Sequence, residues 1–272
     1  MIKTDPVENH RSREEGLIVY PVYSRRSRGL SVGINLFPDR KACSFDCPYC
    51  EVFPFKNDIE FSLEVMESAL RRTLAGLAPG ETVRNICFSG NGEPTLSLDF
   101  IPATETCLRI RDELVPAVDL VVISNGTGLL DSAVFDFLRN AARGASHLKL
   151  WLKLDAGTEA WYLQMDRSAV PFGDLTAKIR EFAASAPFII QTMICAVDGK
   201  SPSPEEAAAW EALLLDLLPG LTGVQLYGKA RPAPEDPLAS ALPAAFLEER
   251  AASLREKFRL KFSNPPVVEV FP

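Results

Sequence analysis

The stretch Cys43-Ser44-Phe45-Asp46-Cys47-Pro48-Tyr49-Cys50 places three thiols within eight residues, in the spacing C-x3-C-x2-C. Thiolates this close in sequence can bind one compact metal centre without ligands from elsewhere in the fold. A [4Fe-4S] cluster normally takes four cysteine ligands, so three thiolates leave one iron with an open coordination position. Catalytic zinc sites keep such a position for chemistry in the same way. The spacing therefore predicts a [4Fe-4S] cluster held by Cys43, Cys47 and Cys50.

Two other interpretations of this stretch are a zinc site that lacks its fourth ligand and a set of three unrelated buried thiols. No Cys-x-x-Cys or His-x3-5-His pair follows that would complete a zinc tetrahedron. The other cysteines, Cys87, Cys107 and Cys195, fall into no ligand spacing and are predicted to be small buried residues, as is His147. The cluster is the favoured interpretation.

Composition bounds the class of protein. The chain has 272 residues, of which 47% are hydrophobic and 24% charged, as expected for one large globular domain. We predict a single domain over residues 1–272, with a core at about 21–235, an N-terminal extension at 1–20, and a C-terminal helix and tail at 236–272. The polar N-terminus lacks a signal-peptide pattern, and no apolar run could span a bilayer. Because the six cysteines do not suggest a disulfide framework, we expect a cytoplasmic protein without a membrane partner.

Charge limits the partners. The net charge of −7 argues against non-specific nucleic-acid binding through a broad basic face. The first fifty residues differ, with eight Lys and Arg against six Asp and Glu. Five of these basic residues could form a positive rim near the cysteine stretch and attract an anionic substrate: Arg25, Arg26, Arg28, Arg40 and Lys41. The alternative is a few solvated arginines.

Short β-rich runs alternate with amphipathic helical patterns, which predicts parallel strands joined by crossover helices. We predict an extended segment at 16–23 and strands at 30–36, 83–88, 120–123, 148–154, 188–194 and 224–227. Helices are predicted at 63–77, 101–114, 131–142, 175–184, from a capping box at Ser203 onward, and at 244–258, with an edge strand in the C-terminal tail. Six such units suit an incomplete barrel, and a doubly wound open sheet would show a similar alternation.

Polar residues follow two of these strands, where the loops of an α/β barrel usually carry function. Gly90-Asn91-Gly92-Glu93 follows the strand at 83–88, and its glycines allow the backbone to approach a ligand closely. Ser124-Asn125-Gly126-Thr127 follows the strand at 120–123. Ordinary Gly/Asn turns would explain the glycines of both segments.

The strand at 148–154 alternates leucines with polar and aromatic residues, although a parallel strand covered on both faces should be apolar on both. Its polar face therefore meets solvent or a polar cavity, and a cavity is favoured because this strand is the fourth of six. Lys153 and Asp155 are predicted to face a ligand there, whereas Lys149 is expected to be deeper and structural. Gln191 and Gln225 on the next two strands line a pocket or pack as core polar groups.

These motifs, with LKLDAGTEAWY and QLYGKARPAPE, resemble those of the radical S-adenosylmethionine (radical SAM) superfamily over about residues 21–235. The resemblance implies an α/β fold, the incomplete (β/α)6 TIM-like barrel of that superfamily. It also implies two cofactors, the [4Fe-4S] cluster and S-adenosyl-L-methionine, whose amino and carboxylate groups chelate the open iron.

The resemblance further implies the cofactor contacts of individual residues. Tyr49 is the aromatic residue before the third cysteine of the family signature. The segment Gly90–Glu93 is similar to the Gly-Gly-Glu motif that binds the methionine ammonium group, with Asn91 in place of its first glycine. Ser124 and Asn125 match the segment beside the ribose and carboxylate. Lys153 is expected to pair with the cofactor carboxylate, Asp155 to accept from a ribose hydroxyl, and Gln191 and Gln225 to line the adenine or substrate pocket.

Within the superfamily, the motifs resemble stand-alone bacterial relatives of the wyosine-base synthases, which rebuild a tRNA guanosine. The archaeal wyosine enzymes bind a second cluster through upstream cysteines, and this chain has no cysteine before Cys43. We therefore expect a radical SAM enzyme with an external reductant such as flavodoxin or ferredoxin and an unidentified substrate. The alternatives are a tRNA-modifying or nucleoside-modifying enzyme, and an iron–sulfur or metal-binding electron-transfer module without catalysis.

Overall fold

The computed structural model describes residues 17–52, 54–78, 80–144, 147–231, 233 and 238–272. These residues form two compact units, each with part of a mainly parallel sheet. The first comprises the chain up to Cys43, Pro54–Ser124 and Gly144–Leu150, and the second comprises Ser44–Phe53, Asn125–Arg143 and Trp151–Pro272. Residues 1–16 of the predicted extension at 1–20, and the predicted core boundary at 235, lie outside the described residues.

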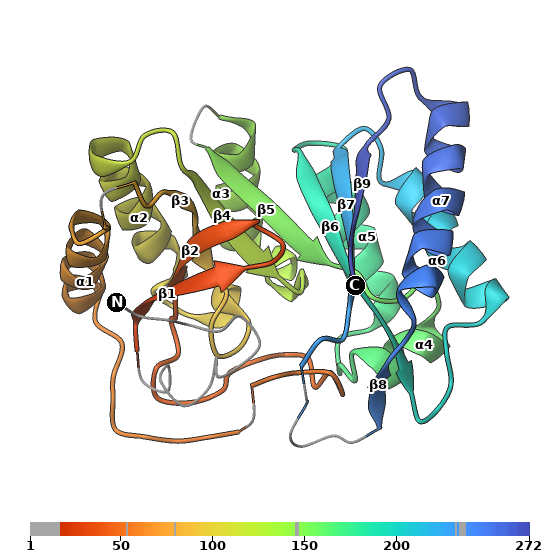
Figure 1. Ribbon diagram of the computed structural model, residues 1–272, viewed down its shortest axis with the longest axis horizontal. Helices are drawn as coiled ribbons and strands as arrows, with labels where there is room; N and C mark the ends of the chain where they lie inside the picture. Colours follow the sequence, from red (N-terminus) through yellow and green to blue (C-terminus); the bar gives the residue numbers. More distant parts are fainter. Residues whose placement is uncertain (1–16, 53, 79, 145–146, 232, 234–237) are drawn as a thin grey trace. The chain divides into compact units, whose positions relative to one another are not determined.

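The sheet of the first unit begins with an antiparallel pair, β1 (Val19–Ser24) and β2 (Gly29–Ile34). Strands β3 (Val83–Phe88) and β4 (Asp119–Ser124) follow in parallel, and β5 (Leu148–Lys153) starts in this unit. Helices α1 (Leu63–Ala75) and α2 (Phe100–Leu114) pack against each other (Figure 1), and η1 (Pro94–Leu96) is a short 3-10 helix.

In the second unit, the end of β5 continues in parallel to β6 (Phe188–Val197), β7 (Leu221–Gly228) and β9 (Val267–Phe271). Strand β8 (Ala239–Ala241) pairs antiparallel with β6. The helices are η2 (Thr127–Leu130), α3 (Ser132–Arg143), α4 (Glu159–Met165), α5 (Phe172–Ala183), α6 (Pro204–Asp216) and α7 (Ala244–Lys261). Strand β9 is the strand predicted in the tail, and that prediction is confirmed. Helix α7 packs along β9 (Figure 1).

The predicted alternation of strands and helices is confirmed, and most predicted bounds are within a few residues of the structure. In α1 the residues buried at helical spacing are Met66, Leu70 and Leu74. The sequence patterns did not reveal α4 and β8, because seven and three residues are too short to show a period. Among the described residues, no helix is both long enough and apolar enough to cross a membrane.

Two predictions about single side chains are wrong. Lys149 is exposed rather than deep, because it is the second residue of β5 and lies near the start of the strand. His147 is exposed, and its ring Nδ1 lies 3.3 Å from Asp119 Oδ1, so it is not a buried residue. The prediction for the scattered cysteines is confirmed, since Cys87, Cys107 and Cys195 are all buried.

Candidate functional site

The cysteine stretch lies in a loop after the carboxyl end of β2. Cys43 is exposed, Cys47 and Cys50 are half buried, and none of the six cysteines forms a disulfide. A turn in which the Cys50 N–H donates to the Cys47 carbonyl at 3.0 Å shapes the end of the stretch. Phe45 is buried, with its ring edge against Tyr162, 5.7 Å between ring centres. The loop therefore presents its thiols from a packed backbone.

In the first unit, the predicted Gly90–Glu93 segment lies directly beside the cysteine stretch. The Ala42 N–H donates to the Asn91 carbonyl at 3.0 Å, and the Glu93 N–H donates to the Ala42 carbonyl at 2.8 Å. Gly92 has a φ of +140°, and a Cβ there would lie 1.8 Å from the Ala42 carbonyl oxygen. Only glycine permits this approach, which places the segment next to Cys43.

Asn91 has a φ of +38°, in the left-handed region that asparagine tolerates better than most residues. This conformation accounts for asparagine where the superfamily motif has glycine. Its side-chain amide donates to the Phe37 carbonyl at 3.1 Å. Its own carbonyl accepts from Ala42, so that oxygen is already engaged by the protein.

Glu93, which follows β3, and Ser124, which ends the neighbouring strand β4, lie together. Glu93 is 2% exposed, and its Oε1 accepts from the Ser124 hydroxyl at 2.8 Å. The same oxygen accepts from the Thr95 N–H at 3.1 Å, which caps η1. A buried carboxylate held by three donors of the protein, the Thr95 hydroxyl included, has a fixed orientation.

In the second unit, Asn125 anchors the cysteine stretch from the other predicted strand end. Its side-chain amide donates to the Ser44 hydroxyl at 2.9 Å, and its Oδ1 accepts from the Thr127 N–H at 3.0 Å. The hydroxyls of Ser44 and Thr127 lie 2.6 Å apart. The Ser168 hydroxyl donates to the Ser44 carbonyl at 2.9 Å. Asn125 therefore holds the residue after Cys43 rather than pointing away from the protein.

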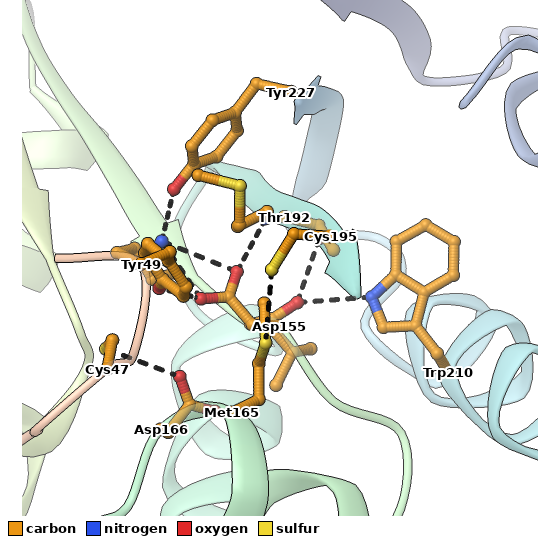
Figure 2. Close-up of polar contacts among 12 residues, drawn as sticks. Cys47, Tyr49, Asp155, Met165, Asp166, Thr192, Cys195, Trp210 and Tyr227 are labelled. Atoms are coloured by element: carbon orange, nitrogen blue, oxygen red, sulfur yellow. Dashed lines mark hydrogen bonds and ion pairs between the residues drawn. The ribbon is translucent and has the colours of Figure 1, made fainter. Parts of the chain in front are cut away.

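Tyr49, Asp155 and Tyr227 are buried and lie together (Figure 2), and the half-buried Lys153 completes the cluster. The Lys153 ammonium lies 3.0 Å from Asp155 Oδ2, and it donates to the Tyr227 hydroxyl. It also lies 4.9 Å and 5.0 Å from the ring centres of Tyr49 and Tyr227, so two aromatic rings flank the cation. The Tyr49 hydroxyl donates to Asp155, whose Oδ1 accepts from the Met193 N–H at 2.8 Å.

Electrostatics in this cluster favour a charged Lys153. Burial alone would lower the pKa of Lys153, but the carboxylate of Asp155 and the hydroxyl of Tyr227 raise it above its usual value. Burial, with the Asp155 carboxylate beside it, raises the pKa of Tyr49 well above its usual value. Lys153 is therefore an ammonium and Tyr49 a neutral phenol, and both contact the carboxylate of Asp155.

Asp166 was not predicted as a site residue. Its carboxylate is 2% exposed and accepts from the Cys47 thiol at 3.9 Å (Figure 2), and its carbonyl accepts from the Asp46 N–H at 2.9 Å. Burial and the nearby Asp155 carboxylate raise the pKa of Asp166 well above its usual value. Asp166 follows the short helix α4, and no motif in the sequence marks it.

Gln191 and Gln225 are buried and bind each other. The Gln191 amide donates to Gln225 Oε1 at 2.7 Å, and the Gln225 amide donates to Glu269 Oε2 at 3.4 Å. Strand register places Lys153, Gln191, Gln225 and Glu269 side by side across four strands. The amides are 0% and 4% exposed, which fits the core-polar alternative better than a pocket wall. No motif in the sequence of the C-terminal tail marks Glu269.

The predicted positive rim is divided. Arg25, Arg26 and Arg28 lie in the turn between β1 and β2, which precedes β2, whereas Arg40 and Lys41 follow it. The two groups are thus separated along the chain by β2, and Arg40 pairs with Asp39.

The cysteine stretch has the donor chemistry that an iron–sulfur cluster requires. Within the described part of the chain, no three His, Cys, Asp or Glu side chains are already arranged to hold a metal ion. The three thiols are nevertheless reduced, partly accessible and on one anchored loop. Their present contacts, Cys47 with Asp166 and Cys50 with the Val52 carbonyl at 3.4 Å, are weak sulfur hydrogen bonds that thiolate ligation can replace. The residues fit the group.

Comparison with curated proteins finds relatives without a described activity. The chain is 33% identical over 122 residues to a UPF0026 protein of Helicobacter pylori and 30% identical over 156 residues to one of Synechocystis. The matches cover 43% and 57% of this chain, and 37% and 53% of those two proteins. No protein-family model matches the chain.

Comparison with solved structures identifies the fold. A radical SAM methyltransferase from Sphaerobacter thermophilus has a TM-score of 0.63 and 19% identity, covering 93% of this chain and 69% of that one. SuiB of Streptococcus suis, bound to S-adenosylmethionine, has a TM-score of 0.62 and 11% identity, covering 91% and 49%. TYW1 with a lysine–pyruvate adduct has a TM-score of 0.54 and 14% identity, covering 83% and 73%. The chain has the radical SAM fold, and the predicted α/β class of incomplete (β/α)6 barrel is confirmed.

Proposed function

We propose that this protein is a radical S-adenosylmethionine enzyme whose [4Fe-4S] cluster is held by Cys43, Cys47 and Cys50. The observation that carries the proposal is the position of the C-x3-C-x2-C stretch, on an anchored loop after the first parallel strand of a radical SAM fold. Four cysteines would fill a cluster, whereas three leave one iron for a ligand. When bound, the cluster and S-adenosylmethionine supply one-electron reductive cleavage to methionine and a 5′-deoxyadenosyl radical, which abstracts hydrogen from an unidentified substrate.

The residues of the chain hold and orient the cofactor in this proposal. The segment Gly90–Glu93, beside Cys43, binds the methionine ammonium group, and Ser124 orients Glu93 for that contact. Lys153 supplies a cation for the cofactor carboxylate. Asp155 already binds Tyr49, Lys153 and the Met193 N–H, so accepting from a ribose hydroxyl requires the exchange of one partner. We assign Asp155 first to positioning Lys153 and Tyr49.

The proposed partners follow from the chemistry. One-electron cleavage needs a reductant, and a small redox protein such as flavodoxin or ferredoxin would supply it. Iron–sulfur chemistry with reduced thiols suits the cytoplasm. An anionic substrate remains the proposed class, and Arg40 and Lys41, which precede the cysteine stretch, are among the basic residues that could attract it.

The test is anaerobic reconstitution with iron and sulfide, followed by an assay for 5′-deoxyadenosine with S-adenosylmethionine and dithionite. We expect product from the unaltered protein and none from Cys43→Ala, Cys47→Ala or Cys50→Ala, because each change removes one iron ligand. Cys107→Ala is the matched control and should keep the activity, since Cys107 is buried in α2 away from any ligand spacing.

Three outcomes would contradict the proposal. The first is full activity in any one of the three ligand variants. The second is zinc in the protein purified without oxygen. The third is an iron cluster whose electron spin resonance spectrum does not change on addition of S-adenosylmethionine, which would favour the electron-transfer module.

A further inference from the structure

Helix α6 carries a buried carboxylate that none of these roles uses. Glu206 is 6% exposed and lies in the first turn of α6. The predicted capping box is half correct, because the Ser203 hydroxyl accepts from the Glu206 N–H at 3.1 Å. The Glu206 carboxylate does not return to Ser203. Its Oε1 accepts from the Gly157 N–H, and its Oε2 accepts from the Thr158 hydroxyl.

These contacts tie α6 to the loop at residues 154–158, which carries Asp155. The Leu154 carbonyl accepts from the Trp210 indole at 3.2 Å and from the Thr192 hydroxyl at 2.8 Å (Figure 2). A Cβ at Gly157 would lie 2.0 Å from the Trp210 backbone nitrogen, so the loop and the helix are in backbone contact. Glu206 and Trp210 therefore hold the loop on both sides of Asp155.

The loop is itself buried at Leu154, Asp155 and Ala156. A small cavity of about 30 Å³ is lined by Asp155, Glu206, Thr192, Met193 and Trp210, among other residues. Close-packed interiors leave few such spaces, and this one gives the loop room to move if a tie is lost. The two hydrogen bonds to a carboxylate are of the stronger, charge-assisted kind.

Glu206 also holds the start of α4. Thr158 is the N-cap of α4, and its hydroxyl accepts from the Trp161 N–H at 3.3 Å. Helix α4 ends at Met165, and the next residue, Asp166, contacts the Cys47 thiol and the Asp46 N–H. The Glu206 carboxylate therefore anchors both the loop that contains Asp155 and the start of α4, the helix that leads to the cysteine stretch.

We propose that Glu206 is a positioning residue that fixes the loop at 154–158, so that Asp155 keeps Lys153 and Tyr49 in their orientation for the cofactor. The consequence for cofactor binding rests on the proposed function. The consequence for the loop does not, because it concerns contacts that exist without a cofactor. A test must therefore measure both the mobility of the loop at 154–158 and the affinity for the cofactor.

The first measurement is hydrogen–deuterium exchange of the iron-free protein. In Glu206→Ala we expect faster exchange in peptides that cover residues 154–158 and Met193, by about tenfold, since the Gly157 amide loses its acceptor and Asp155 loses its support. Glu206→Gln keeps an oxygen for the Gly157 amide and should stay close to the unaltered protein. Glu205→Ala, in the same turn but exposed, should change nothing.

The second measurement is the dissociation constant of S-adenosylmethionine for the reconstituted proteins. We expect it to rise about tenfold in Glu206→Ala and not in Glu205→Ala. If Glu206→Ala does not fold, Glu206→Asp keeps the charge but is too short to reach both donors, and it should show the same two changes to a smaller degree.

Unchanged exchange at 154–158 in both Glu206→Ala and Glu206→Asp would overturn the proposal, and so would equal effects in Glu205→Ala. Faster exchange with unaltered cofactor affinity would overturn the link to Asp155. Failure of the unaltered reconstituted protein to bind S-adenosylmethionine would instead count against the proposed function, while the exchange measurement would still decide whether Glu206 holds the loop.

Discussion

Glu93 shows how a single side chain can be prepared for a ligand by its neighbours. One of its oxygens collects the donors of Thr95 and Ser124, which fixes the plane of the carboxylate beside the loop that holds Cys43. In the proposed enzyme this carboxylate binds an ammonium group. Glu93→Gln keeps the shape and an acceptor but removes the charge. We expect the dissociation constant of S-adenosylmethionine to rise about tenfold or more, because hydrogen bonds to a charged group contribute roughly 1.5–3 kcal/mol.

The matched control for Glu93 is Glu105→Gln, an exposed residue of α2. Iron content after reconstitution should equal that of the unaltered protein in both variants, because neither residue is a cluster ligand. Calorimetric titration with S-adenosylmethionine measures the affinity. Equal affinities in the two variants would remove Glu93 from the cofactor site.

The cysteines differ in environment, and their reactivity should follow. Burial raises the pKa of Cys87 to about 11 and that of Cys195, which also lies near the Asp155 carboxylate, to about 12. The thiolate is the reactive form, so at pH 8 only roughly a thousandth of Cys87 would react even with full access. Alkylation of iron-free protein by iodoacetamide at pH 8 should modify exposed Cys43 first and spare Cys87, Cys107 and Cys195.

Mass spectrometry of peptides reads out this alkylation pattern. Raising the pH toward 11 should speed modification of Cys87, because a larger share becomes thiolate, and urea should expose all three buried cysteines. Reconstitution with iron and sulfide should protect Cys43, Cys47 and Cys50 together. Modification of Cys87 as fast as Cys43 at pH 8 would contradict the burial on which this prediction depends.

At the same scale, the sequence identified residues but not their partners. Cys43, Glu93 and Asn125 were recognisable because each stands in a short motif. The contacts of Asp155 could not be recognised in the sequence, because Tyr49 and Met193 reach it from segments about 106 and 38 residues away. Asp166 stands in no motif, and the capping box that contains Glu206 indicates a helix start and not a contact of its carboxylate. The importance of both carboxylates follows only from what the fold places beside them.

At the scale of elements, strands and long helices were predictable because burial on one face repeats with a regular period. The helix α1 and the strand β3 illustrate this, with β3 observed at the predicted residues. What periodicity cannot predict is how a loop is anchored. The bridge between Ala42 and Gly92 joins two loops that are fifty residues apart, and nothing local in either loop indicates it.

This bridge predicts a strong effect of one methyl group. Gly92→Ala puts a side chain where the Ala42 carbonyl lies and keeps a φ of +140° that only glycine adopts readily. We expect a loss of stability of at least about 2–3 kcal/mol, a melting temperature lower by several degrees, and less iron bound after reconstitution. Gly173→Ala is the control, since nothing lies within 4 Å of a Cβ there.

Thermal melting with iron analysis separates two outcomes for Gly92→Ala. A lower melting temperature with reduced iron content would show that the bridge holds the loop of Cys43 in place. A melting temperature and an iron content equal to those of Gly173→Ala would mean that the two loops move apart without cost, and the bridge would not be needed.

For the whole molecule, charge is the property that bears on the class of substrate. The sequence shows an excess of basic residues at its start, but β2 separates the arginines of the β1–β2 turn from Arg40 and Lys41. The interpretation as a tRNA-modifying enzyme needs a broad basic face, which the net charge of −7 does not favour. Proteins that neutralise many phosphates bind nucleic acid with an affinity that falls steeply with salt.

We therefore expect no salt-dependent binding of bulk tRNA in a gel-shift titration between about 50 and 200 mM salt. A variant with Arg25, Arg26 and Arg28 changed to alanine is the control, and it should behave like the unaltered protein. The contrary result, retention of tRNA that weakens with salt and is lost in this variant, would place RNA on the β1–β2 turn. It would favour an RNA-modifying enzyme, and the radical chemistry proposed for Cys43, Cys47 and Cys50 would then act on a nucleoside instead of a small anionic molecule.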